Sequence, residues 1–179
     1  EAAVKLPRVI AIGEIGLDYF HKYGDRRTQI ELFIDQLELA ARLDLPVIIH
    51  NREAGKDVLE VLRDRMPPAG AVLHCYSEDA EYADRVIQAG LNVYFSFAGN
   101  LTYRNARNLH ETASMLPLDR ILVESEAPFM VPAEYRGKRN KPEYLPSTVW
   151  FLSEILQVSP EEAAETTYQN ACRFFRLEP

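Results

Sequence analysis

Ionisable side chains recur where short apolar runs of the sequence end. Glu14 follows the first run, His50 the second, His74 the third, and Glu124 and Glu126 the fifth. In a βα barrel the carboxyl ends of the strands converge on one mouth, where active sites lie. Imidazoles and carboxylates gathered there form a nitrogen-and-oxygen ligand set suited to zinc, manganese or magnesium. Two metals bridged by a carboxylate could position a hydroxide and polarise a phosphoryl oxygen.

Each of these residues also has a structural interpretation. A single histidine after a strand is more often a hydrogen-bonded core residue than a metal ligand, and a glutamate beside a glycine can simply cap a loop. Recurrence at the ends of most of the runs favours the metal site, but the pattern alone leaves both interpretations open.

The elements expected to position these residues alternate between two patterns. Short apolar runs, rich in β-branched residues, are typical of strands buried on both faces. They cover residues 9–12, 46–49, 71–73, 91–97 and 121–123. Between them, apolar residues spaced by three and four predict helices with a core-facing stripe. These stripes comprise Ile30, Phe33, Ile34, Leu37 and Ala41, then Val58, Val61 and Leu62, then Ala83, Val86 and Ile87.

The succession of βα units predicts a parallel sheet with right-handed crossovers. A loop rich in proline and charge, residues 127–146, precedes two closing helices, 147–157 and 160–175. Ser159 and Pro160 form a good start for the second helix. A complete eight-stranded barrel takes about 250 residues. The 179 residues here would fit a doubly wound open sheet better, so the strand-end residues have to decide.

Composition is that of an ordinary globular protein, with 47% hydrophobic and 26% charged residues. The formal net charge of −7 argues against a broad basic face that coats nucleic acid, but not against an enzyme acting on nucleic-acid ends. No apolar run approaches the roughly 20 residues needed to cross a bilayer. Because Cys75 and Cys172 suggest no disulfide framework, we expect a cytoplasmic protein.

Four segments resemble, in order, the motifs of the TatD family, metal-dependent deoxyribonucleases with an amidohydrolase-like TIM barrel. They are GEIGLDY at 13–19, PVIIH at 46–50, LHCY at 73–76 and VESEAP at 123–128. The likeness includes FSFAG at 95–99 and RGKRNKP at 136–142, and it covers essentially the whole chain. Each motif is weak alone, but their order and spacing together are highly specific.

The resemblance implies roles for four residues. Glu14 would bridge two metal sites, His50 and His74 would be imidazole ligands, and Glu126 would be the last acidic ligand, holding the metal or accepting a proton. Glu14 and Glu126 are thus the expected catalytic carboxylates. The implied cofactor is one or two divalent ions, Mg²⁺ first, with Mn²⁺ or Zn²⁺ as alternatives. The implied substrate is DNA, single-stranded or at 3′ ends.

Two departures from the family pattern stand out. The family's first-strand His-x-His pair is absent, and the opening residues look like the approach to the family's fourth strand. We therefore expect one domain, residues 1–179, shortened at its N-terminus: an incomplete barrel of about five strands with two closing helices. Glu126 replaces an aspartate, and its extra methylene moves the carboxylate by about 1.5 Å. That shift predicts reduced or altered activity.

Four more residues are candidates for substrate contact: Arg52, Tyr76, Arg139 and Asn140. Arg52 could hold a phosphate bidentately, and Tyr76 could stack on a base. Arg104, with Arg139 and Asn140, could bind a phosphodiester backbone, and Phe129 could stack on a base as Tyr76 could. Surface solvation and core packing are the competing interpretations for all of these residues.

The remaining ionisable and aromatic residues receive structural expectations. Asp18 and Tyr19 order the loop after Glu14, contact substrate or make structural hydrogen bonds. His21 and His110, which have no partner pattern, are expected at the surface. Cys75 is expected to be a small buried side chain rather than a ligand.

Two other functions remain open from sequence. One is a hydrolase of small amides, lactones or phosphoesters on the same scaffold, because fold alone does not set substrate. The other is a non-catalytic remnant.

Overall fold

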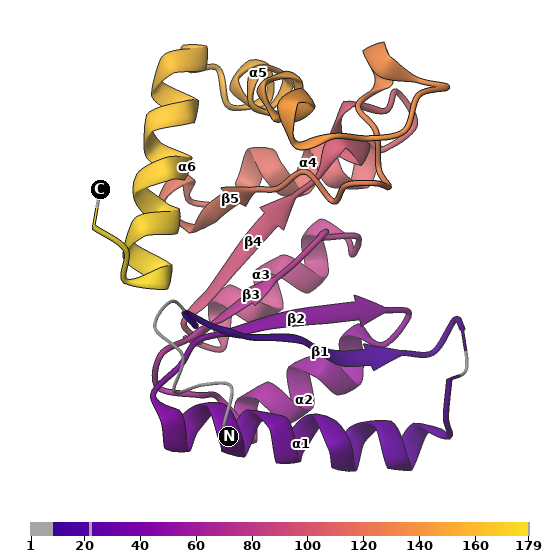
Figure 1. Cartoon of the computed structure of the whole chain (residues 1–179), viewed down its shortest axis with the longest axis vertical. Coiled ribbons are helices and arrows are strands. Elements are labelled where there is room, and N and C mark those ends of the chain that lie inside the picture. Colours follow the sequence, from indigo (N-terminus) through magenta and orange to yellow (C-terminus); the bar gives the residue numbers. More distant parts are fainter. Residues whose placement is uncertain (1–8, 22, 179) are drawn as a thin grey trace.

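The computed structural model describes residues 9–21 and 23–178. Its strands form one parallel sheet, in which each pairs with the next along the chain (Figure 1). The strands are β1 (Ile12–Asp18), β2 (Val47–Arg52), β3 (Ala71–Leu73), β4 (Val93–Phe97) and β5 (Ile121–Val123).

The strand order distinguishes between the two sheet types that the sequence left open. The order β1-β2-β3-β4-β5 never reverses. A doubly wound sheet has a point at which the order reverses, whereas a βα barrel adds strands consecutively. The sheet is therefore of the barrel type, as predicted from the strand-end residues.

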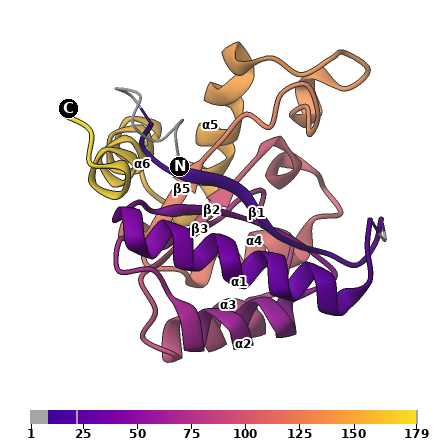
Figure 2. The same cartoon turned by 60° about the horizontal axis from the view of Figure 1, so that its bottom comes forward.

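Helices follow the strands and surround the sheet. In Figure 2, α1, α2 and α3 lie on one side of the strands and α6 on the other. The helices are α1 (Arg26–Leu43), α2 (Gly55–Arg65), α3 (Ala80–Gln88), α4 (Arg107–Met115), α5 (Leu145–Leu156) and α6 (Pro160–Phe175). Short 3₁₀ turns are η2 (Gly99–Thr102), η3 (Leu118–Arg120), η4 (Ala133–Tyr135) and η5 (Pro142–Tyr144).

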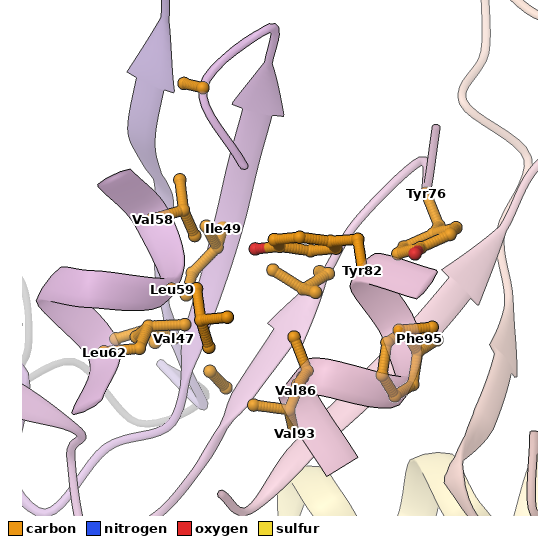
Figure 3. Close-up of a cluster of buried hydrophobic side chains, with 14 of the residues drawn as sticks. Val47, Ile49, Val58, Leu59, Leu62, Tyr76, Tyr82, Val86, Val93 and Phe95 are labelled. Atoms are coloured by element: carbon orange, nitrogen blue, oxygen red, sulfur yellow. The ribbon is translucent and has the colours of Figure 1, made fainter. Parts of the chain in front are cut away.

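The main core fills the space between the sheet and the outer helices. Val47 and Ile49 of β2 point toward Val58 and Leu62 of α2 (Figure 3), and all four are fully buried. Leu73 and Phe95 continue the same layer on the next two strands, in register with Ile49. This packing holds β2, β3 and β4 rigidly, so the residues at their carboxyl ends have fixed positions.

The opposite face of the sheet carries a second, smaller apolar cluster. Side chains alternate between faces along a strand, so Val72, Tyr94 and Leu122 point away from the main core. Phe174 of α6 packs on them, with its ring centroid 5.0 Å from that of Tyr94. The last helix is thereby attached to the sheet.

Several predicted boundaries were wrong. The first strand is Ile12–Asp18 rather than 9–12, and β2 continues to Arg52, so Glu14 and His50 lie within strands instead of after them. Pairing between β1 and β2, which reaches Asp18 and Arg52, extends both strands beyond their apolar runs.

Other differences concern helices. No stripe was recognised for α4, because its buried face includes the polar Thr112 beside Leu109 and Ala113. The loop predicted for 127–146 includes two 3₁₀ turns, and α5 begins at Leu145, with Pro146 in its first turn. The closing helix Pro160–Phe175 is confirmed, and the Ser159 side chain caps it by accepting a hydrogen bond from the Glu162 N–H.

Candidate metal centre

β1 approaches β2 unusually closely where the candidate ligands lie. Gly16 pairs with His50, and a Cβ at Gly16 would lie 2.0 Å from the His50 carbonyl oxygen. Only glycine fits there, and its φ of +135° favours glycine as well. Just before it, the register shifts between Ile12 and Ile15. This irregularity carries Glu14 and places its carboxylate near the end of β3.

His74, at the end of β3, lies at the centre of the cluster. Its Nε2 lies 3.2 Å from Oε2 of Glu14 and 3.5 Å from Nδ1 of His50. The imidazole of His74 is only 8% exposed, whereas the carboxylate of Glu14 is 55% exposed. A nearly buried imidazole thus faces a carboxylate that is open to solvent.

The other nitrogen of His74 faces two carboxylates that follow β5. Its Nδ1 lies 3.3 Å from Oε1 of Glu124 and 3.8 Å from Oε2 of Glu126. Glu124 is held firmly, because its Oε1 accepts the Cys75 N–H at 2.8 Å and its Oε2 accepts the Ser96 hydroxyl at 2.5 Å. His74 therefore joins groups from β1, β2 and the end of β5.

These donors fit divalent ions. Among the residues that the structure describes, two groups have ligand atoms within 4.8 Å of one another: Glu14, His50 and His74, and His74, Glu124 and Glu126. Twice a metal–ligand distance of about 2.0–2.4 Å is about 4–5 Å, so one ion could contact every member of either group. Imidazole nitrogens and carboxylate oxygens are also the right donors for zinc, manganese or magnesium.

The electrostatics of the cluster agree with that fit. Burial lowers the pKa of His74, but its hydrogen bond to Glu124 and the charges of Glu14 and Glu126 outweigh burial, so the pKa is raised. Burial raises the pKa of Glu126, and the neighbouring Glu124 and Glu14 raise it further against the opposing effect of His74. Three carboxylates around one imidazole leave excess negative charge, which a cation would neutralise.

The four predicted ligands, Glu14, His50, His74 and Glu126, therefore come together in space. Glu124 joins them, although sequence reasoning left it out of the ligand set. The signal was present, because Glu124 directly follows β5, and β3 and β5 end at the same edge of the sheet.

A cavity of 280 Å³ opens beside the cluster. His74 and Glu126 line it together with Arg52 and Phe20. The guanidinium of Arg52 lies 5.1 Å from the centre of the Phe20 ring, whose side chain is half-exposed. Arg52 thus lines the cavity beside the candidate ligands, and its contact with phosphate stays a prediction.

Two predicted substrate contacts are corrected. Tyr76 is 2% exposed, packs between Phe95 and Phe97, and donates its hydroxyl to the Asp79 carbonyl at 2.7 Å, so it has no surface on which a base could stack. Asn140 is 4% exposed, and its amide donates to the carbonyls of Ser125 and Phe129. Asn140 therefore ties the loop after β5 together.

The other candidate contacts are exposed. Arg139 and Phe129 lie at the surface of the same long loop. Arg104 lines a separate hollow with Arg136 and Glu134, which shares no lining residue with the cavity beside the cluster. Of the three predicted arginine contacts, Arg52 lines the cavity that contains the candidate ligands.

The two histidines expected at the surface both have partners. His21 lies 2.7 Å, through Nδ1, from Oδ2 of Asp18. His110 is half-buried, donates from Nε2 to the Leu101 carbonyl at 2.8 Å, and packs near Phe151. His21 is exposed, as predicted, and its partner lies only three positions earlier in the chain, whereas the partner of His110 lies nine positions earlier.

The surroundings of Tyr19 and Cys75 raise the pKa of both side chains. The Tyr19 hydroxyl donates to Asp57 at 2.5 Å, and burial with that hydrogen bond raises the pKa of Tyr19 to about 12. Burial and nearby Glu124 raise the pKa of the Cys75 thiol to about 12. Both cysteines are free thiols, as expected, and Cys75 belongs to neither ligand group.

A parallel βα sheet with imidazoles and carboxylates at the carboxyl ends of its strands is the arrangement of metal-dependent barrel hydrolases. The model of the TatD related DNase family matches residues 1–176, and the chain belongs to that family. Across residues 9–21 and 23–178, no helix is long and apolar enough to span a membrane.

Relatives carry names consistent with this class. The chain is 39% identical over 171 residues to the metal-dependent hydrolase YabD of Bacillus subtilis, covering 95% of this chain and 66% of that protein. It is 38% identical to the metal-dependent hydrolase YcfH of Escherichia coli, covering 95% and 64%. It therefore spans slightly less than two thirds of either relative.

Solved structures share the fold. The TatD homologue YjjV of Escherichia coli superposes with a TM-score of 0.85 at 32% identity, covering 94% of this chain and 64% of that one. A TatD family hydrolase of Entamoeba histolytica superposes with a TM-score of 0.79 at 22% identity, covering 93% and 63%. These neighbours have the TIM-barrel fold, which agrees with the predicted fold class.

Proposed function

We propose that the protein is a divalent-metal-dependent hydrolase that cleaves phosphodiester bonds of DNA, from single strands or 3′ ends. The observation that carries the proposal is the position of His74. Its two ring nitrogens face Glu14 on one side and Glu124 and Glu126 on the other, so two ligand groups share one imidazole.

The residues of the cluster would have two roles, metal binding and proton transfer. Glu14, His50, His74, Glu124 and Glu126 would hold one or two divalent ions, with Mg²⁺ the first choice and Mn²⁺ or Zn²⁺ the alternatives. Such ions supply Lewis-acid polarisation of a phosphoryl oxygen and activation of water. Glu126 would also accept a proton, because a raised pKa makes its carboxylate a stronger base.

A phosphodiester substrate is supported by the groups beside the cluster. Arg52 offers a fork of donors that matches phosphate geometry. Phe20, which shares the cavity with Arg52, offers an exposed ring on which a base can stack. With Arg52 on the phosphate, the scissile group would be directed toward His74 and Glu126.

The test is cleavage of an end-labelled single-stranded oligonucleotide by the full-length protein. Magnesium, manganese and zinc are each added to metal-free protein, and EDTA is added to a parallel sample. The matched variant is His74→Gln, which removes the shared ligand and keeps a polar side chain of similar size. We expect cleavage that needs metal, stops with EDTA and is lost in the variant.

Two other results would contradict the proposal. Hydrolysis of simple phosphate or carboxylate esters without DNA cleavage would indicate a small-molecule hydrolase. Metal binding by the wild-type protein no tighter than by His74→Gln, with no hydrolysis, would indicate a non-catalytic remnant.

A further inference from the structure

The carboxylate of Asp18 lies between two imidazoles. Its Oδ2 lies 2.7 Å from Nδ1 of His21 and 3.1 Å from Nε2 of His50. Its Oδ1 accepts the backbone N–H of His21 at 2.8 Å. The side chain is only 11% exposed, so the carboxylate contacts histidine groups instead of bulk water.

The position of Asp18 does not depend on His50. Asp18 ends β1 and pairs with Arg52 in the sheet. Its backbone N–H donates to Oε1 of Gln29 at 2.9 Å, and its carbonyl accepts from Nε2 of Gln29 at 3.0 Å. Gln29 lies on α1, so a strand and a helix fix the residue before its side chain meets either imidazole.

This arrangement determines which nitrogen of His50 carries a proton. A carboxylate only accepts hydrogen bonds, so the contact with Nε2 requires a proton on Nε2. In a neutral imidazole the other nitrogen is then an unprotonated acceptor. That nitrogen, Nδ1, lies 3.5 Å from Nε2 of His74 and 3.9 Å from Oε2 of Glu14, within the ligand group.

We propose that Asp18 is the positioning residue that keeps His50 in the Nε2–H tautomer and directs its unprotonated Nδ1 toward the metal ligands Glu14 and His74. The metal part of this inference rests on the proposed function. The tautomer is a property of the metal-free protein, so the two can fail separately.

His21 provides the matched control. It donates to the same oxygen of Asp18, but its side chain is 48% exposed, stacks on Tyr23 and belongs to neither ligand group. Removing this imidazole by His21→Ala leaves the contact between Asp18 and His50 intact. Asp18→Asn is the test variant. If its single oxygen keeps the backbone bond, its NH₂ faces Nε2 of His50 and donates, which moves the ring proton to Nδ1.

The experiment measures the proton position by ¹⁵N-detected NMR of the histidine rings in full-length metal-free protein. The His50 signal is assigned by its loss in His50→Gln. We expect Nε2–H in the wild type and in His21→Ala, and Nδ1–H in Asp18→Asn. Mn²⁺ affinity, measured by calorimetry, should fall about 10- to 100-fold in Asp18→Asn, as for other outer-shell partners of metal ligands, and stay near wild type in His21→Ala.

Several results would overturn the inference. A wild-type His50 protonated on Nδ1 overturns it without any variant. So does an Asp18→Asn protein that is folded by circular dichroism and keeps the wild-type tautomer. A changed tautomer with unchanged Mn²⁺ affinity overturns the positioning role. If the wild type binds no Mn²⁺, the proposed function fails, while the proton position still decides whether Asp18 controls His50.

Discussion

Nδ1 of His74 lies 3.3 Å from Oε1 of Glu124, although 50 positions separate the two residues along the chain. The contact crosses from the end of β3 to the end of β5, passing over β4. Ser96 of β4 completes it by donating its hydroxyl to the other oxygen of Glu124. The carboxylate is thus oriented by three adjacent strand ends.

Glu124→Gln should therefore impair metal binding. Glutamine has one carbonyl oxygen, so it cannot accept from both Cys75 and Ser96 while also facing His74. We expect Mn²⁺ affinity to fall by about 10- to 100-fold or more, because substitutions of outer-shell partners of metal ligands already cost that much. Titration calorimetry measures it, with the surface variant Glu60→Gln as control. Unchanged affinity would make Glu124 a purely structural residue.

Glu126→Asp should raise DNA cleavage in the full-length protein. The shorter side chain restores the family's reach, and a misplacement of about 1 Å can cost about 100-fold in rate. Glu126 also has a φ of +53°, a conformation that aspartate adopts more readily than glutamate. The rate constant under single-turnover conditions is the measurement, and a rate equal to wild type or lower would refute the idea.

Arg52→Lys should weaken DNA binding more than catalysis. Lysine keeps the charge but loses the bidentate fork. Hydrogen bonds to charged groups contribute about 1.5–3 kcal/mol, so KM should rise about 10- to 100-fold. Arg104→Lys, on an exposed arginine outside the cavity, is the matched control. Equal effects of both substitutions would indicate a general charge effect instead of a site at Arg52.

Asp57, whose side chain is buried, should stabilise the fold through hydrogen bonds to Tyr19 and to the exposed Arg26. It accepts from Arg26 through both oxygens, at 2.6 and 2.7 Å, and from the Tyr19 hydroxyl. The hydrogen bond from Arg26 holds the pKa of Asp57 below its usual range despite burial. Asp57→Asn should lower the free energy of unfolding by about 1–3 kcal/mol at pH 7.

The pH dependence of this effect has a definite sign. Because the folded-state pKa is lowered, the stabilisation is fully present above the unfolded-state pKa of about 3.9 and is lost as pH falls through the folded-state value. Urea unfolding in EDTA should therefore show the gap between wild type and Asp57→Asn closing below about pH 4. Asp44→Asn, which breaks an exposed pair with Arg176, should change stability little. A gap that widens in acid would contradict this account.

The sequence alone determined the alternation of the sheet and helices and most of the candidate ligands. Apolar runs and stripes are local patterns, and they follow from the period of each element. Parallel strands end at one edge, so Glu14, His50, His74 and Glu126 were expected to meet, and they do. The sequence did not reveal the register shift in β1 that carries Glu14, because such a shift arises from pairing with the neighbouring strand.

Only the tertiary structure decided the direction of individual side chains. Cys75 has a φ of +42°, which turns the chain after β3 and sends Tyr76 into the core between Phe95 and Phe97. Asn140 stabilises the long loop, because folding of that loop brings two backbone carbonyls to its side-chain amide. The bond between Asp18 and His50 likewise joins the ends of two strands. These outcomes depend on contacts between distant segments, which residue type and spacing do not encode locally.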